Sequence, residues 1–313
     1  MLLAAAERRL GLVAHLAALI PDHRDPSRIT HGLDELLRAR IFAIACGYPD
    51  ADDLDALRHD PAFKLACGRL PDSGVDLASQ PTMSRCENAP DLRTLVRLGH
   101  GMIDLWCGGH ARPPRAITLD IDDTVDVVHG HQQLSLFNAH YDERCFLPIH
   151  VYDTATGRPV AMLLRTGKTP SGAEAAGHIR RLVRHLRRHW PETHITIRGD
   201  GHYGRPEVMA FCEPAGVDYV FGLPGNRPLA MKVDETAEAV RVERALENRD
   251  VVRAYAETRY RARSWDRERR AIARIEATRL GLDVRFVVTN LPNGAAQWLY
   301  DSLYCARFRV VCS

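Results

Sequence analysis

The sequence predicts an α/β protein in which a helical N-terminal domain precedes a mixed sheet. Residues 1–112 repeat apolar side chains at helical spacing, whereas the chain from Arg115 onward alternates apolar and polar residues as strands do. Two predicted strands, ITLDID at residues 117–122 and ITIRGD at residues 195–200, each end in an aspartate. Strands that deliver acids to the end of a sheet indicate a functional site there.

The N-terminal domain, residues 1–112, is predicted to consist of helices alone. Apolar residues recur at helical spacing through residues 33–44, and a further helix is expected over residues 91–106. The Pro113-Pro114 pair then breaks the chain before the first strand. No set of catalytic side chains is evident in this domain.

Residues 113–228 have the element order of a ribonuclease-H-like fold. The predicted strands and helices, in chain order, are strands at 117–122, 146–152 and 159–164, a helix at 172–190, a strand at 195–200, a helix at 205–214 and a strand at 217–223. A right-handed crossover would place the 195–200 strand parallel to the 117–122 strand and beside it. That arrangement would bring Asp122 and Asp200 together.

Residues 229–293 are predicted to form a β-rich insertion, and residues 294–313 the start of a final helix. The insertion begins with a helix, which is followed by strands at 251–264, 269–278 and 284–289. The final helix is expected to begin near Ala295.

The composition excludes several classes of protein. The 313 residues carry a formal net charge of +2, and no apolar run is long enough to span a bilayer, so no membrane partner is expected. The eight cysteines include no CxxC pair, which favours reduced thiols in the cytoplasm over a disulfide framework or a zinc site. The basic residues are mostly arginines, whose planar guanidinium groups suit phosphate.

The acids at the strand ends predict a divalent metal site. Asp122 and Asp200 are the candidate catalytic residues and metal ligands, and Asp120 is a further candidate ligand. Carboxylates held close together are unfavourable unless a cation neutralises them. The alternative is that each aspartate simply ends its strand and faces water. The nearby His129 and His131 are interpreted as polar loop residues that contact DNA rather than as metal ligands.

Two arginine-rich segments are candidate phosphate-binding surfaces. The candidate DNA-binding arginines are Arg180, Arg184, Arg187 and Arg188 on the 172–190 helix and Arg259, Arg261 and Arg263 on the 251–264 strand. Alternation along a strand would place the last three on one face. The alternative is a solvated sheet face that neighbouring glutamates neutralise. Trp265 and Trp298 could stack on a base, but packed core aromatics are the more common case.

The motifs LDIDDTVDVVHGHQQ, RGDGHYGRPEVMAFCEPAGVDYVFGLPGN and YDSLYCAR together resemble the DDE transposases of bacterial insertion sequences. Within these, the chain resembles the group with a Tyr-x2-Arg-x3-Glu-x6-Lys signature. The resemblance implies cleavage and strand transfer at terminal inverted repeats, dependent on Mg²⁺ or Mn²⁺. Its implied partners are double-stranded DNA, both the repeats and the target, and a second copy of the chain in a homodimer. A bacterial cytoplasmic protein associated with the nucleoid would follow.

The resemblance also implies roles for individual residues. Asp122 matches the first catalytic aspartate, with Asp120 and Asp123 as open alternatives, and Asp200 matches the second. Tyr304 and Arg307 match the first two signature positions and are further candidate DNA-binding residues.

The third acid of the family pattern is missing. Val311 stands where the signature has glutamate, and the sequence ends at Ser313 before the signature lysine. The expectation is a truncated transposase with impaired catalysis. The alternative is a catalytically inactive DNA-binding remnant, and a stand-alone nuclease is a weaker third interpretation.

Overall fold

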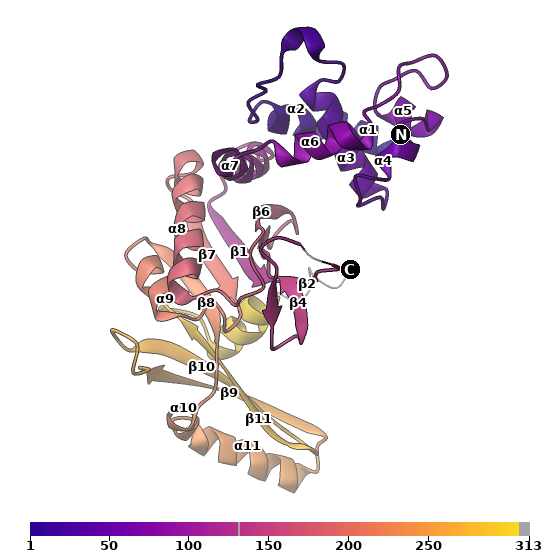
Figure 1. The fold of residues 1–313 in the computed structure, drawn as a ribbon. Coiled ribbons are helices and arrows are strands. Elements are labelled where there is room, and N and C mark those ends of the chain that lie inside the picture. Colours follow the sequence, from indigo (N-terminus) through magenta and orange to yellow (C-terminus); the bar gives the residue numbers. More distant parts are fainter. Residues whose placement is uncertain (131, 307–313) are drawn as a thin grey trace. The chain divides into compact units, whose positions relative to one another are not determined.

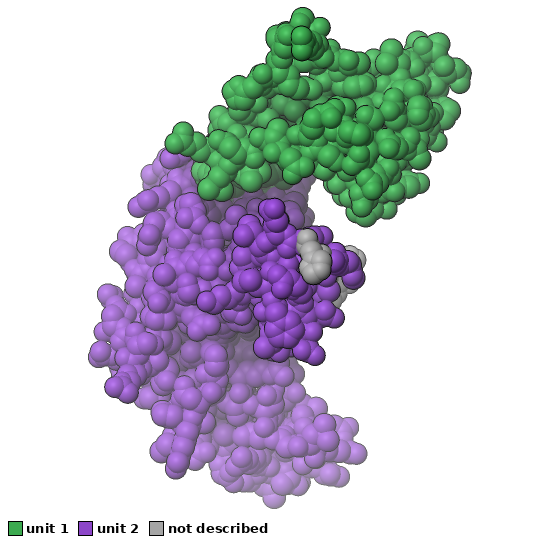
Figure 2. All heavy atoms as spheres, viewed as in Figure 1, with its two compact units in different colours: residues 1–108 green, residues 109–313 purple. Residues whose placement is uncertain are grey.

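The computed structural model describes residues 1–130 and 132–306. The chain divides into two compact units, residues 1–108 and residues 109–313 (Figure 2). None of the helices in the described residues is both long and apolar enough to cross a membrane.

The first unit is helical, as the sequence predicted. Its helices are α1 (Leu2–Leu10), α2 (Leu12–Ala17), the short 3₁₀ helix η1 (Pro26–Arg28), α3 (Leu33–Ala45), α4 (Leu54–Leu57), α5 (Pro61–Ala66), α6 (Gln80–Asn88) and α7 (Leu92–Gly108). Helix α3 lies at the centre of the apolar core, because Leu36, Ala39 and Ala43 recur on one face and are buried.

The second unit is built on an eight-stranded mixed sheet. Its strands are β1 (Ala116–Asp123), β5 (Ile149–Asp153), β6 (Pro159–Leu163), β7 (His194–Gly199), β8 (Val217–Leu223), β9 (Val251–Tyr260), β10 (Arg269–Thr278) and β11 (Gly281–Thr289). They lie in the order β6-β5-β1-β7-β8-β11-β10-β9 (Figure 1). A separate small sheet has the order β2-β4-β3, from β2 (Asp126–Val127), β3 (Leu136–Asn138) and β4 (Glu143–Phe146).

The predicted fold class is confirmed. Strands β6, β5, β1, β7 and β8 are in the order expected of a ribonuclease-H-like sheet. Strand β7 lies parallel to β1 and beside it, with Ile121 opposite Gly199 at the end of the pairing. The crossover between them contains α8 (Gly172–His189), whose apolar face is buried. The crossover rule therefore placed the two acidic strand ends side by side.

The segment predicted as a β-rich insertion continues the same sheet. Strand β11 pairs antiparallel with β8, and β10 and β9 follow outward. Helix α11 (Asp234–Glu247) packs on β9, β10 and β11, while α9 (Pro206–Cys212) packs on α8 and β8, and α10 (Arg227–Met231) precedes α11. The proposed domain boundaries at residues 112, 228 and 293 stay predictions.

Two strand predictions were wrong in their limits. The strand predicted at 146–152 divides into β4 and β5, because Leu147 and Pro148 interrupt it. The strand predicted to reach Ser264 ends at Tyr260 instead. There the Trp265 amide donates to the Ala262 carbonyl at 3.0 Å, and the buried Trp265 ring packs edge-on against Tyr260. Burial of this indole favours a turn over a longer strand.

The final helix begins where the sequence predicted, because the Leu299 amide donates to the Ala295 carbonyl at 3.0 Å. Its central part, η2 (Trp298–Tyr304), is wound as a π-helix. Leu299 and Tyr300 are buried against Val220 and Ile272 of the large sheet. This packing fixes the start of the helix on β8 and β10.

Gly222 in β8 allows the turn after β7 to approach the sheet closely. A Cβ atom added there would lie 2.9 Å from the Gly201 nitrogen, 2.9 Å from the Tyr304 hydroxyl and 3.1 Å from the Asp200 carbonyl carbon. Backbone atoms cannot move aside as a side-chain tip can. The same close approach places the Tyr304 hydroxyl next to the backbone of Asp200.

We expect Gly222→Ala to lower the free energy of unfolding by about 1–3 kcal/mol, the usual effect of overpacking a tight site. Chemical denaturation of the full chain measures it. Gly177→Ala on α8 is the matched control, because its Cβ would meet only the Arg181 Nη1 atom at 3.7 Å. That variant should be neutral or gain up to about 1 kcal/mol. Equal stability of the two variants would contradict the close approach.

Candidate metal centre

Three side chains converge at the ends of β1 and β7. The Asp123 carboxylate accepts from His202 Nδ1 at 3.1 Å and 3.3 Å, and Asp200 Oδ2 lies 3.8 Å from the same nitrogen. One ligand atom from each of Asp123, Asp200 and His202 falls within 4.8 Å of the other two. The structure therefore brings the predicted Asp200 together with Asp123, the residue beside the predicted Asp122.

The local backbone explains how Asp200 reaches this group. Asp200 directly follows the last residue of β7, so the chain turns there and no longer obeys strand alternation. Asp200 Oδ1 accepts from the His202 amide at 2.9 Å, which closes a tight turn typical of aspartate. Burial of the Asp123 side chain is nearly complete, with 2% exposed, whereas Asp200 is 36% exposed.

Asp122 lies next to this group and is half-buried. Its Oδ1 atom accepts from the Asp123 amide at 2.9 Å. Asp122 is also one residue beyond Ile121, the last β1 residue that pairs with β7. It is therefore at the same sheet edge as Asp200, on the opposite face of β1 from Asp123.

Asp120 has a different partner from the predicted metal. Both of its carboxylate oxygens accept from Arg198, at 2.6 Å from Nε and 2.7 Å from Nη2, and Thr154 donates to Oδ2 at 3.2 Å. Asp120 and Arg198 are opposite each other in the paired strands and are both buried. This bidentate pair engages both carboxylate oxygens, so the structure gives Asp120 a partner other than a metal, and its role as a metal ligand stays a prediction.

Burial and the carboxylates at this edge raise the pKa of two nearby tyrosines. Burial raises the pKa of Tyr203 far above its usual value, and Asp123, Asp122 and Asp200 raise it further. Burial and the same three carboxylates also raise the pKa of Tyr141. The Tyr203 side chain is fully buried, and its hydroxyl has no hydrogen-bond partner among the described residues.

The donor set at this edge fits a divalent cation. It offers two carboxylates and an imidazole, with a buried, unpartnered hydroxyl beside them. A buried carboxylate is costly unless it is paired, and Asp123 pairs with the half-exposed His202. The sequence analysis did not predict His202 as a site residue, although its position two residues after Asp200 could have indicated it. Of the histidines considered there, His129 is exposed and His131 lies outside the described residues.

The family model for the transposase DDE domain, group 1, matches residues 1–310. The chain belongs to this transposase family. The resemblance to DDE transposases is thereby confirmed, whereas an origin in a bacterial insertion sequence stays a prediction. No curated protein matches the sequence.

Among solved structures, this DDE-family chain is similar to a piggyBac transposase in a synaptic complex with hairpin DNA. The identity is 13% and the TM-score is 0.46, and the likeness covers 91% of this chain and 59% of that chain. The chain thus spans less than two thirds of the piggyBac chain.

The arginines of α8 in this DDE-family chain differ in their surroundings. Arg187 donates to the carbonyls of Pro191, Thr193 and Gly216, so it closes the turn after the helix. Arg180 stacks over the Phe211 ring at 5.3 Å. The remaining two candidates, Arg184 and Arg188, are exposed. Of the four α8 arginines predicted to bind DNA, Arg187 is the one whose guanidinium group donates to backbone carbonyls.

The arginines predicted to alternate along one strand do not do so. Arg259 is exposed on β9, but Arg261 and Arg263 lie beyond its end in the turn to β10. Arg261 Nε donates to the Trp265 carbonyl at 3.2 Å, which leaves Arg259 and Arg263 with exposed guanidinium groups. The alternation prediction failed because the buried Trp265 ends the strand early.

The signature residues of the final helix are only partly described. Tyr304 is half-buried, and its ring lies 5.5 Å from that of Tyr300. Its hydroxyl faces Gly222 beside the Asp200 backbone, and its role in DNA binding stays a prediction. Arg307 and Val311 lie outside the described residues.

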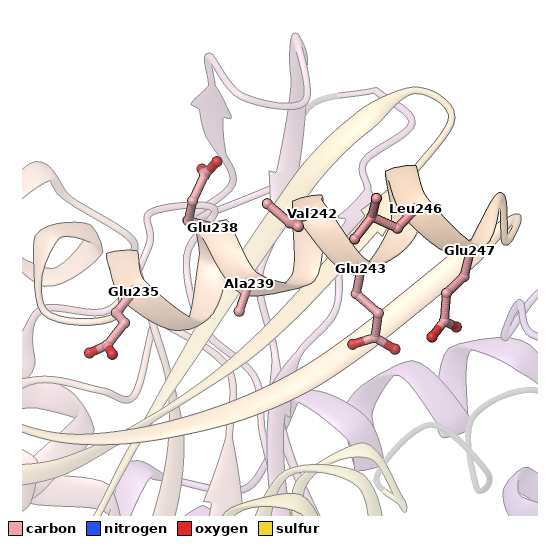
Figure 3. A pocket seen from close by; sticks show the side chains of 7 residues that line it. All are labelled: Glu235, Glu238, Ala239, Val242, Glu243, Leu246 and Glu247. Atoms are coloured by element: carbon pink, nitrogen blue, oxygen red, sulfur yellow. The ribbon is translucent and has the colours of Figure 1, made fainter.

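Helix α11 presents a face lined by glutamates. Figure 3 shows a shallow hollow along it, lined by Glu235, Glu238, Glu243 and Glu247 together with Ala239, Val242 and Leu246. Three of these carboxylates are paired, Glu238 with Arg241, and Glu243 and Glu247 with Arg249. The face is therefore of mixed charge.

The helical unit contains a hollow that the sequence did not reveal. It has a volume of about 1140 Å³, and its lining includes the five arginines Arg24, Arg28, Arg85, Arg93 and Arg97. Of its two acids, Asp22 pairs with Arg24 at 2.6 Å, and Asp91 accepts from the Thr94 amide at the start of α7. The surplus of arginine makes this hollow a candidate phosphate-binding site. The spacing of Arg93 and Arg97, one helical turn apart, was the available signal.

Proposed function

We propose that this chain is a DNA transposase that cleaves double-stranded DNA at terminal inverted repeats and joins the ends to a target. One observation supports this most strongly. In a chain of the transposase DDE family, Asp123 and Asp200 converge at the ends of adjacent parallel strands. Close carboxylates at such an edge are the arrangement that metal-assisted phosphoryl transfer needs.

In this proposal, Asp122, Asp123 and Asp200 hold Mg²⁺ or Mn²⁺. When bound, such ions activate a water or a 3′ hydroxyl and stabilise the leaving oxygen. Asp120 and Arg198 act on the structure instead, because their buried pair ties β1 to β7 just before the acids. Arg198 also donates to the Leu303 carbonyl of the final helix, so the same pair fixes Tyr304 beside Asp200.

The proposed DNA contacts come from arginines whose guanidinium groups are free to reach phosphate. In the second unit these are Arg180, Arg184, Arg188, Arg259 and Arg263. In the first unit they are the arginines of the hollow other than Arg24, whose Nε and Nη2 atoms donate to Asp22. A homodimer that pairs two DNA ends completes the proposal.

We expect Arg184→Ala/Arg188→Ala to weaken binding to all duplex sequences alike. Each lost phosphate contact should reduce the slope of log affinity against log salt by about 0.9, hence by about 1.8 in total. Fluorescence anisotropy with a labelled duplex across a salt series measures this. Arg93→Ala/Arg97→Ala tests the hollow in the same assay.

Arg38→Ala is the control for both variants, since Arg38 lies on α3 outside the hollow, 3.7 Å from Asp34. Its salt slope should equal that of the unchanged chain. A pair variant with an unchanged slope would remove its surface from the DNA path.

The proposed activity itself is tested with a linear duplex that carries the chain's own gene and its flanking sequence. Strand cleavage at the flanks, dependent on added Mg²⁺ or Mn²⁺, is the expected result. The second candidate function, a DNA-binding protein without cleavage, is favoured by Val311 at the signature glutamate position. Binding with intact salt dependence but no cleavage in either metal would support that second function.

A further inference from the structure

The geometry of His202 goes beyond the acids expected of a DDE transposase. Its Nδ1 atom is 3.1 Å from Asp123 Oδ1 and 3.8 Å from Asp200 Oδ2. Ligands about 2.1 Å from one ion in octahedral geometry lie about 3.0 Å apart when adjacent and about 4.2 Å apart when opposite. The two distances fall within this range. His202 Nδ1 is therefore at a suitable distance from each carboxylate, and the two carboxylates lie within 4.8 Å of each other.

The backbone holds His202 in this place. Its amide donates to Asp200 Oδ1 at 2.9 Å, so the imidazole and the Asp200 carboxylate belong to one tight turn. Tyr203, the next residue, is fully buried and so anchors the turn in the core. A Cβ at Gly199 would lie 3.1 Å from the Tyr203 Cβ, which shows how closely this turn is packed.

Two further observations point to a ligand that the protein alone does not supply. The Asp123 side chain is 2% exposed, yet its ion-pair partner His202 is 40% exposed. The Tyr203 hydroxyl is buried without a hydrogen-bond partner among the described residues, close enough to Asp123, Asp122 and Asp200 to sense their charge. Buried polar groups are normally satisfied, so this hydroxyl beside converging carboxylates indicates a site for an ion and its bound water.

We propose that Asp123, Asp200 and His202 form a metal site of mixed oxygen and nitrogen donors that selects Mn²⁺ over Mg²⁺. This rests on the proposed function and specifies its metal. Mg²⁺ prefers oxygen ligands and keeps several waters, whereas imidazole suits transition metals. His202 thus adds a nitrogen ligand to the two carboxylates.

Pulsed electron paramagnetic resonance on the full chain with Mn²⁺ alone tests the proposal. The expected spectrum shows a ¹⁴N coupling from one imidazole, which changes when the histidines are labelled with ¹⁵N. His202→Ala should lose the coupling and bind Mn²⁺ at least about tenfold more weakly, the scale on which loss of support around a metal acts. The labelling experiment needs no variant, so it stands even if His202→Ala folds poorly.

A matched control is present on the same strand. His194 pairs with Asp218, with Nε2 to Oδ2 at 2.7 Å, and it lies at the opposite end of β7 from Asp200. His194→Ala should keep both the coupling and the Mn²⁺ affinity. In contrast, His202→Asp makes the donor set all-oxygen and should shift the affinity ratio of the two metals toward Mg²⁺.

Bound Mn²⁺ without a ¹⁴N coupling, or equal affinity for the two metals in the unchanged chain, would overturn the proposal. So would a coupling that persists in His202→Ala. These outcomes are separable from failure of the proposed function. Mg²⁺-dependent cleavage that Asp200→Asn abolishes would uphold the transposase while His202 is rejected as a ligand.

Discussion

Replacing Asp200 with asparagine is expected to lower metal-dependent cleavage of duplex DNA by about a thousandfold or more. The reason is that Asp200 is one of the two carboxylates that converge at the sheet edge, and loss of a metal ligand removes several kcal/mol of transition-state stabilisation. Single-turnover cleavage of the end-bearing duplex measures the effect. Thermal unfolding of the same variant should be little changed, because Asp200 is partly exposed.

The neighbouring aspartates divide the roles further. Asp123→Asn should lose both cleavage and Mn²⁺ binding by the free chain. Asp122→Asn should lose cleavage but weaken Mn²⁺ binding less than Asp123→Asn does, since Asp122 is not part of the group with His202. Asp218→Asn is the control, because Asp218 pairs with His194. Full cleavage by Asp200→Asn, or loss of cleavage in Asp218→Asn, would contradict the assignment.

Replacing Arg198 with methionine is expected to lower the free energy of unfolding by about 3–5 kcal/mol, because it leaves Asp120 buried without its partner. Arg198 is 1% exposed and also donates to Thr154 and to the Leu303 carbonyl, so the change loosens three elements at once. Chemical denaturation of the full chain measures the loss.

The double variant Asp120→Asn/Arg198→Met should be less destabilised than Arg198→Met alone, since no unpaired charge remains. Arg188→Ala, an exposed change in the same unit, should stay within about 0.5 kcal/mol of the unchanged chain. A mild effect of Arg198→Met, equal to that of Arg188→Ala, would show that the buried pair does not hold the strands together.

The fold was predictable for two reasons. Apolar residues repeat at different spacings in strands and in helices, and a crossover connection between parallel strands is almost always right-handed. Alternation in residues 117–122 and 195–200 predicted β1 and β7, and the amphipathic helix between them required a parallel pair. The limits of β9 were not predictable from alternation alone. They depend on Trp265, whose burial against Tyr260 is a tertiary contact.

The structure brings the predicted Asp200 together with Asp123, the neighbour of the predicted Asp122. The assignment of the catalytic residues stays a prediction. Strand alternation grouped Asp120 with Asp122, and it holds for Asp120, which faces Arg198 across the pairing. It does not hold for Asp200, because the chain turns immediately after Gly199 and carries that carboxylate toward Asp123. Side chains alternate between the two faces of a sheet only inside a strand. The candidate acids lie where the strands end, so alternation does not predict their direction.

Sequence spacing also did not predict which arginines are free to bind phosphate. Arg187 and Arg261 have the same side chain as Arg188 and Arg263, but local carbonyls occupy their donors. Which arginine is free depends on the ends of α8 and β9 rather than on its spacing. The arginine-lined hollow arises from segments spread over residues 20–97, so the spacing of Arg93 and Arg97 alone did not predict it.

The most direct test is to locate the metal. Crystals of the full chain soaked in Mn²⁺, with diffraction collected near the manganese absorption edge, give an anomalous difference map that needs no assumption about activity. The expected result is a peak within coordination distance of both Asp123 and Asp200. A peak at other carboxylates, with none between these two in a crystal that binds Mn²⁺ elsewhere, would contradict the metal centre on which the proposed function rests.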